Sequence, residues 1–114
     1  MNTRELRIGN YVKVGERIVK VNSLTQHKIG YCPESCRERY VRSREVEPIR
    51  INGEILAHVS FGEFGFINNF AVVQHEDGKI EIVFPVLCKK CIYLHELQNI
   101  YQLLTGTELS FLSE

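Results

Sequence analysis

The strongest periodic pattern in the chain lies near its end, between Tyr93 and Leu109. Apolar residues recur there at the three- and four-residue spacing of an amphipathic helix, so they form one stripe along it. The stripe consists of Leu94, Leu97, Ile100, Tyr101 and Leu104, and it is widened by Leu103. Gly106 follows directly after the periodic run, as a left-handed C-cap should. The pattern predicts a C-terminal amphipathic helix that packs across the rest of the protein, with Leu109 folding back onto its last turn.

The opposite face of this helix carries amides and a histidine rather than the usual lysines and glutamates. Its members are His95, Gln98, Asn99 and Gln102. Amides both donate and accept hydrogen bonds, so they suit the backbone of a loop or of a partner. Two interpretations follow: the amides hold a loop of the same chain, or they form an interaction surface for a protein partner. No nucleophile or carboxylate lies at a telling distance from His95, so we do not expect catalysis there.

The N-terminal half shows the two-residue alternation of strands. Residues 6–22 predict two strands around a tight turn at Gly15-Glu16, and residues 27–32 predict a third. The segment 37–50 continues to Glu47-Pro48, where the proline ends the element. We therefore predict a small antiparallel, SH3-like sheet in this half.

The second half predicts a short helix, an aromatic linker and a hairpin. Asn52 is a suitable N-cap for a helix from Gly53 to Ser60. Residues 70–85 alternate around Asp77-Gly78, which favours a two-residue type I′ turn. The aromatic residues between these elements are Phe61, Phe64, Phe66 and Phe70. Together the patterns predict a single α+β domain, 1–114, made of a basic β-rich half, 1–50, and an acidic helix-hairpin-helix half, 51–114.

Composition is that of an ordinary soluble protein, with 44% hydrophobic and 25% charged residues. No apolar run approaches the roughly 20 residues that span a bilayer, and the first ten residues lack an apolar signal segment. We expect a cytoplasmic protein with no membrane partner. The net charge is zero, yet residues 1–50 hold eleven Lys+Arg against six Asp+Glu, and residues 51–114 hold three against eight. This split indicates a basic N-terminal surface, head-to-tail association, or a match between two packed halves.

An arginine-rich stretch concentrates the positive charge. It comprises Arg37, Arg39, Arg42 and Arg44, with Tyr40 among them. On a strand, Arg37 would share a face with Arg39, and Arg42 with Arg44. Together with Lys13, Lys20 and Lys28, these side chains would track a phosphate backbone, with Tyr31 or Tyr40 stacking on bases. The alternative is a solvated face whose arginines pair with neighbouring glutamates or with the acidic half.

Four cysteines form two pairs, Cys32 with Cys36 and Cys88 with Cys91. Two such pairs are able to supply the four thiolates of a structural zinc site, with Lys89 and Lys90 holding thiolates ionised. The first pair has three intervening residues instead of two, and the gap between pairs is long for a zinc ribbon. The alternative is four ordinary thiols in a reducing compartment. Zinc is the only cofactor that the sequence suggests.

The sequence offers little for catalysis. Its four histidines are scattered without metal-ligand spacing. No phosphate-binding loop, dinucleotide-binding glycine pattern or nucleophile elbow is present in the sequence. We therefore do not expect an enzyme.

Four segments resemble a family of short uncharacterised proteins from gut Bacteroidota, their phages and their mobile elements. Such chains begin with a segment like Glu5–Asn10, contain one like Glu47-Pro48-Ile49 followed by an element like Phe64-Gly65-Phe66, and end with a helix like Leu94–Thr105. The resemblance spans most of the chain, and the C-terminal motif is its most specific part. Arg50-Ile51-Asn52 departs from the family, which tends to have Pro-Leu-Thr there, and the cysteines lie outside the shared pattern. The family implies no established activity.

Taken together, the sequence predicts a small binding or accessory protein of phage or mobile-element type. Its expected partner is another protein or a second copy, contacted through the amide face of the closing helix. The alternative is a nucleic-acid-binding module that uses the arginines of the N-terminal half.

Overall fold

A computed structural model describes residues 1–33, 37–60, 71–84 and 89–111. It divides the chain into two compact units, Met1–Ile49 and Arg50–Glu114, and each has its own buried apolar cluster. The boundary lies one residue from the predicted change between the basic and the acidic half. The α+β class is confirmed, with three small antiparallel three-stranded sheets, a short helix and a longer C-terminal helix. Where the sequence predicts one domain, the structure has two units with separate cores.

The first unit consists of short strands and two 3-10 turns. In chain order its elements are η1 (Thr3–Glu5), β1 (Tyr11–Val14), β2 (Arg17–Lys20), β3 (Ser23–Leu24), β4 (Lys28–Tyr31), β5 (Arg39–Arg42), η2 (Ser43–Glu45) and β6 (Val46–Glu47). They form two antiparallel sheets of order β2-β1-β6 and β3-β4-β5. The turn between β1 and β2 is the predicted Gly15-Glu16, and Gly15 adopts a positive φ of 61°.

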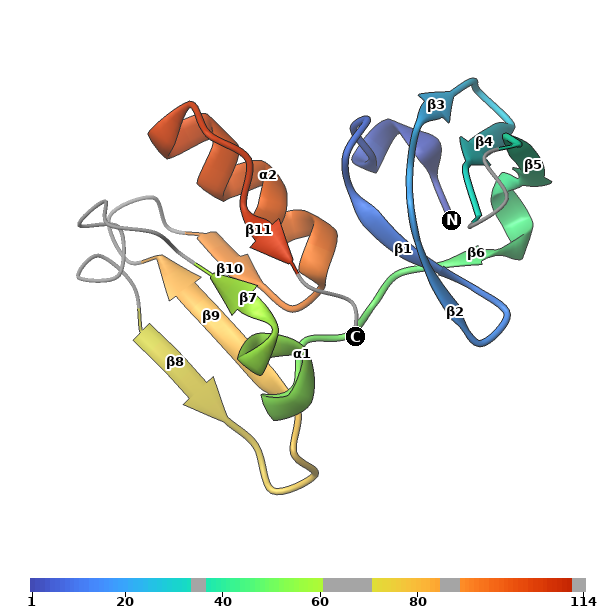
Figure 1. Ribbon diagram of the computed structural model, residues 1–114. Coiled ribbons are helices and arrows are strands. Elements are labelled where there is room, and N and C mark those ends of the chain that lie inside the picture. The colour runs from blue at the N-terminus through green and yellow to red at the C-terminus, as the bar shows by residue number, and fades with distance from the viewer. Residues whose placement is uncertain (34–36, 61–70, 85–88, 112–114) are drawn as a thin grey trace. The chain divides into compact units, whose positions relative to one another are not determined.

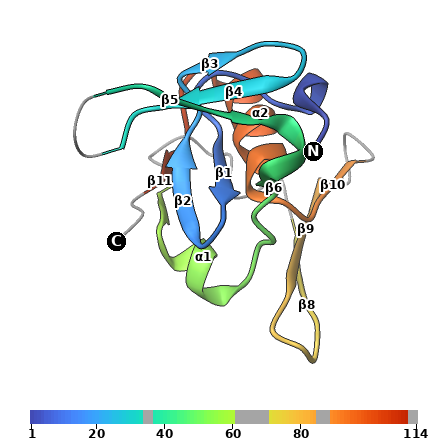
Figure 2. The same cartoon turned by 90° about the vertical axis from the view of Figure 1, so that its right-hand side faces the viewer.

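One bent strand joins the two sheets of this unit. Val21, between β2 and β3, donates to the Asn10 carbonyl at 2.8 Å and accepts from the Gly9 amide at 2.8 Å. The next residue, Asn22, donates to the Gly30 carbonyl on β4 at 2.7 Å. The strand therefore pairs with β1 along its first part and with β4 along its second, and Figure 2 shows β3, β4 and β5 beyond the bend.

The side chains that face inward from both sheets form the core of the first unit. Its buried members are Leu6, Val12, Val21, Ile29 and Val46. Val41 on β5 packs against them, so the alternate residues of β5 point away. The predicted antiparallel N-terminal sheet is confirmed. The two sheets are joined by the bent strand, and η2 precedes a last strand, β6, that returns to β1. The SH3-like arrangement stays a prediction.

The second unit consists of two helices and two further sheets. Its elements are α1 (Gly53–Ala57), β7 (Val59–Ser60), β8 (Ala71–Gln74), β9 (Ile80–Phe84), β10 (Lys89–Cys91), α2 (Leu94–Thr105) and β11 (Ser110–Phe111). The strands form a sheet of order β10-β9-β8 and a two-stranded pair of β7 with β11, all antiparallel. Figure 1 shows α2 and the β7–β11 pair beside the three-stranded sheet.

Alternation along β9 builds the core of this unit. Ile80, Ile82 and Phe84 are buried, whereas the residues between them are only partly covered. From α2, Leu97 and Tyr101 join the same cluster. Removing four or five such side chains from water contributes on the order of 1.5–3 kcal/mol for each one before conformational entropy is subtracted.

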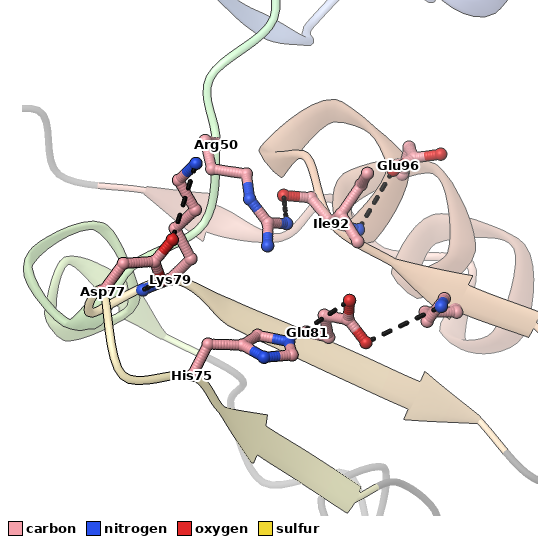
Figure 3. Close-up of polar contacts among 8 residues, drawn as sticks. Arg50, His75, Asp77, Lys79, Glu81, Ile92 and Glu96 are labelled. Carbon is pink, nitrogen blue, oxygen red and sulfur yellow. Dashed lines mark hydrogen bonds and ion pairs between the residues drawn. The ribbon is translucent and has the colours of Figure 1, made fainter.

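An extended segment at Arg50–Asn52 ties this core together. The Ile51 amide donates to the Ile92 carbonyl at 3.0 Å, and the Ile51 carbonyl accepts from the Ile80 amide at 2.9 Å. The Arg50 guanidinium donates to the same Ile92 carbonyl at 3.0 Å, while the Glu96 carboxylate accepts from the Ile92 amide at 3.1 Å (Figure 3). Ile51 itself is fully buried. The chain entering the unit is thereby fixed to both β9 and the start of α2.

Two local predictions for this unit are wrong, and one strand was not predicted. The helix that begins after Asn52 ends at Ala57, because Val59 and Ser60 pair with β11 as strand β7. The hairpin reverses over three residues, Glu76–Gly78: His75 bonds to Lys79, and Gly78 has a φ of 85°. Strand β10 was not anticipated, because long-range pairing with β9 specifies it. The aromatic linker at 61–70 lies outside the described residues.

The closing helix is confirmed at Leu94–Thr105, with Gly106 as a left-handed cap at φ 73°. Leu109 is buried in the core, as predicted. The predicted stripe holds for Leu94, Leu97 and Tyr101 but is wrong for Leu103 and Leu104, which are 76% and 47% exposed. After the turn at Gly106, Leu109 takes the core position near the end of the helix, so these two leucines are left outside.

Leucine truncations on α2 test this assignment of its faces. We expect Leu97→Ala to lower the free energy of unfolding by about 2–5 kcal/mol, because it leaves a cavity in the core. The matched control, Leu103→Ala, removes the same atoms from an exposed position and should change stability by about 0.5 kcal/mol or less. Urea denaturation followed by circular dichroism measures both. Equal effects of the two substitutions would contradict the described orientation of the helix.

Candidate nucleic-acid interface

The predicted amide face of α2 is not an exposed surface. His95 and Gln98 are buried at 3% and 1% exposure, and only Asn99 and Gln102 remain partly accessible. The His95 ring is stacked on the Tyr93 ring at 5.9 Å with 14° between their planes. The buried side of α2 is wider than its apolar stripe and includes His95 and Gln98. The hydrophobic pattern alone therefore predicted these two residues on the wrong side of the helix. The prediction that His95 and Gln98 form an interaction surface is therefore wrong, because both side chains are buried.

The predicted arginine-rich surface is exposed. Its members Arg37, Arg39, Tyr40, Arg42 and Arg44 are all solvent-accessible. Three of them lie on β5 and Arg44 lies in η2. The strand alternation predicted for Arg42 and Arg44 is wrong, because the 3-10 turn begins at Ser43 and changes the direction of the side chains.

These cations have no carboxylate partners among the described residues. The two neighbouring glutamates have other hydrogen-bond partners: Glu38 accepts from the Ser23 hydroxyl at 2.6 Å, and Glu45 accepts from the Arg42 backbone amide at 3.3 Å. Within the described part of the chain, none of the four arginines forms an ion pair with an acidic side chain. The alternative of an internally paired face therefore finds no support in the described residues.

Strand register places a tyrosine and two cations on the outer face of the β3-β4-β5 sheet. Because Ile29 and Val41 face the core, the residues alternating with them face outward. Tyr40 lies directly opposite Gly30, and Arg42 lies directly opposite Lys28. We call this surface the tyrosine face. Its members are Ser23, Lys28, Gly30, Tyr40 and Arg42.

Gly30 makes the centre of the tyrosine face possible. A Cβ atom built at Gly30 would lie only 3.0 Å from Cε1 of the Tyr40 ring and would collide with Ser23 Oγ and the Glu38 carboxylate. A side chain at this position would therefore displace all three groups. Without one, the ring lies against the backbone of β4 and remains 61% exposed. The face thus presents a broad aromatic surface beside a pair of cations.

Sequence reasoning identified Tyr40, Arg42 and Lys28 but missed Ser23 and Gly30. A glycine inside the strand pattern of residues 27–32 was the available signal, because such a glycine marks close approach of another group. The sequence carries no comparable signal for Ser23, since its position depends on the bend at Val21 and Asn22.

A second polar cluster lies on the β8–β9–β10 sheet. Glu81 lies 3.3 Å from His75 Nε2 and 3.7 Å from Lys90 Nζ, and Asp77 pairs with Lys79 across the turn (Figure 3). Both basic side chains around Glu81 are largely exposed, so these ion pairs contribute at most about 1 kcal/mol. The described residues contain no cluster of three or more metal-binding side chains. The arrangement is that of a solvated surface.

The structure describes two of the four cysteines, Cys32 and Cys91. Cys32 is exposed in the first unit, Cys91 is fully buried in the core of the second, and Cys36 and Cys88 lie outside the described residues. Burial raises the pKa of the Cys91 thiol to about 12, and Glu96 adds to this effect while Lys89 opposes it. Lys89 acts in the predicted direction, but burial has the larger effect on this pKa. A zinc site stays a prediction.

Thiol alkylation distinguishes the two described cysteines. We expect native protein at pH 8 to react with iodoacetamide at Cys32, while Cys91 is protected until unfolding because it is buried and protonated. Peptide mass spectrometry measures both positions, with urea-unfolded protein as the control. Equally fast alkylation of both in the native state would contradict the buried site.

The raised pKa of Cys91 also predicts a pH dependence of stability. Its folded pKa of about 12 lies above the unfolded value of 9.0, so the contribution is complete below pH 9 and is lost as pH rises toward 12. Wild type should therefore lose more unfolding free energy than Cys91→Ala over this range in denaturant titrations. If the unfolding free energies of wild type and Cys91→Ala fell in parallel with pH, the Cys91 thiol would have the same pKa in the folded and the unfolded protein.

Comparisons with known proteins do not identify a family for this chain. No family model matches the chain, and no curated protein and no solved structure matches it either. None of the described helices is long and apolar enough to cross a membrane. The function is therefore inferred from the chain's own geometry, of which the tyrosine face is the best-defined part.

Proposed function

We propose that the first unit binds single-stranded nucleic acid through the tyrosine face. The observation that carries this proposal is the direct cross-strand placement of Lys28 and Arg42 beside an exposed Tyr40. The function is one of binding rather than catalysis, and we place it in the cytoplasm.

Like charges directly opposite each other on a sheet destabilise it. Lys28 and Arg42 occupy such a position, and no described carboxylate pairs with either one. An anion between them would relieve the repulsion, and a phosphate group suits both side chains. The cost of keeping two cations together therefore supports a phosphate-bearing ligand.

Tyr40 supports a single-stranded ligand in particular. Its ring lies on the sheet with 61% of its surface exposed, so it offers a face on which a base can stack. A base inside a duplex is already stacked on both sides, whereas an unpaired base is available. Stacking on an aromatic side chain contributes about 1–3 kcal/mol per base and tolerates any sequence.

The other arginines extend the positive surface. Arg37 and Arg44 lie just before and after β5. Arg39 lies on β5 opposite the buried Tyr31, so its exposed side chain leaves from the other side of the sheet. Arg37 and Arg44 would follow the phosphates on either side of the stacked base, and Arg39 adds to the positive potential around them. Such contacts release bound counterions, so affinity should fall steeply as salt rises.

Charge reversal on the tyrosine face tests the proposal. We expect wild type to bind labelled single-stranded DNA or RNA more tightly than duplex, and Lys28→Glu with Arg42→Glu to weaken this binding at least about tenfold. Fluorescence anisotropy at two salt concentrations measures affinity and its salt dependence. Tyr40→Ala should also weaken binding, whereas Tyr40→Phe should retain it, because the ring is what stacks.

The matched control reverses two cations on β2, Arg17→Glu with Lys20→Glu. Both residues are exposed in the same unit, and the change in net charge is identical. This variant should keep most of the affinity, since it leaves the tyrosine face intact. Equal loss in both variants would show that net charge alone governs binding, and no binding by wild type at low salt would refute the proposal.

Self-association is the second candidate function. Leu103 and Leu104 form an exposed apolar pair on α2, and the two halves of the chain carry opposite net charge. A second copy docking on this pair would bury apolar surface, and the opposite charges would favour a head-to-tail arrangement. This retains the predicted protein partner but moves its surface from His95 and Gln98 to the end of the helix.

Reversing the character of this surface tests self-association. If it occurs, wild type should form dimers or larger species as concentration rises, and Leu103→Glu with Leu104→Glu should keep the protein monomeric. Light scattering coupled to size-exclusion chromatography measures both. A wild type that stays monomeric at all concentrations would remove this candidate.

The resemblance to phage and mobile-element proteins of Bacteroidota stays a proposal about origin. Nucleic-acid binding by a small accessory protein is compatible with such a setting. The support for the proposed function is nevertheless the geometry of the first unit and not the resemblance.

A further inference from the structure

We propose that Glu38 is a specificity-determining residue that makes the tyrosine face prefer bases with an exocyclic amino group over thymine and uracil. This inference rests on the proposed function and adds a ligand preference to it. It concerns the point above Gly30 where side chains from separate segments meet.

The convergence is specific to this position of the sheet. Ser23 lies on β3, Tyr40 lies on β5, and Glu38 is the residue just before β5. A Cβ at Gly30 would contact all three side chains, which shows that they surround the same small volume. The Glu38 carboxylate therefore lies beside the ring on which a base would stack.

Ser23 holds this carboxylate in place. Its hydroxyl donates to one Glu38 oxygen at 2.6 Å, a short bond typical of a charged acceptor. The carboxylate has several lone-pair sites, so it can accept from a ligand as well. None of the arginines nearby pairs with it among the described residues. An exposed acceptor is thus fixed at the edge of the aromatic surface.

A carboxylate accepts hydrogen bonds and cannot donate them. Cytosine and adenine carry amino donors, whereas thymine presents a carbonyl acceptor at the corresponding position of cytosine. A base stacked on Tyr40 with its edge toward Glu38 would therefore gain a charge-assisted hydrogen bond if it carries an amino group. Thymine and uracil have one donor on that edge, N3–H, and the carbonyl oxygens on both sides of it are repelled by the negative charge.

Homopolymer titrations test the inference. We expect labelled ten-nucleotide dC and dA strands to bind wild type about fivefold or more tightly than the dT strand, in fluorescence anisotropy at fixed salt. Glu38→Gln should bring the three affinities close together, because an amide both accepts and donates. It should also tighten binding to all three strands, since a negative charge near the phosphates is removed.

Ser23→Ala is the charge-neutral companion variant. It leaves Glu38 negative but removes the hydroxyl that positions it, so the ratio of the dC and dA affinities to the dT affinity should fall toward one. Circular dichroism spectra like those of wild type confirm that both variants are folded.

The outcomes separate the two proposals. Binding of dC, dA and dT with equal affinity would overturn the role of Glu38 and leave the proposed function standing. A preference that persists in Glu38→Gln would also overturn it. No binding of any strand by wild type would overturn the proposed function, and this inference with it.

Discussion

The first unit depends on the backbone hydrogen bonds at the bend between Val21 and Asn22. These two residues bond in succession to strands of different sheets, so they fix the register of both at once. A slip of one residue would exchange inward and outward side chains along β3 and β4. The position of Ser23 opposite Gly30 is therefore a consequence of the same bonds that enclose the core.

The second unit has a comparable constraint in Ile51. Its two backbone bonds link β9 to Ile92, two residues before α2, while its side chain lies in the core. The two units, of 49 and 65 residues, are small for independent folding, and each relies on a few fully buried side chains. Both units thus use one buried residue to join elements that are distant in sequence.

Elements with strong local signals were predictable from the sequence. The closing helix, its Gly106 cap and the alternation of β9 follow directly from periodicity and turn chemistry. Features set by distant partners were not, such as the end of α1 at Ala57 and the existence of β10. For the candidate site, the exposed arginines and Tyr40 were identified, but the depth of His95 was misjudged, because burial depends on what covers a helix and not on its own pattern.

The glycine at the centre of the tyrosine face has a consequence for the thermodynamics of binding. Because the Tyr40 ring lies against backbone and the Glu38 carboxylate is held by Ser23, neither group must search for its bound conformation. Side chains that are ordered before a ligand arrives lose little conformational entropy when it binds. A surface with one aromatic ring and few cations can thereby keep a larger share of its interaction energy as affinity.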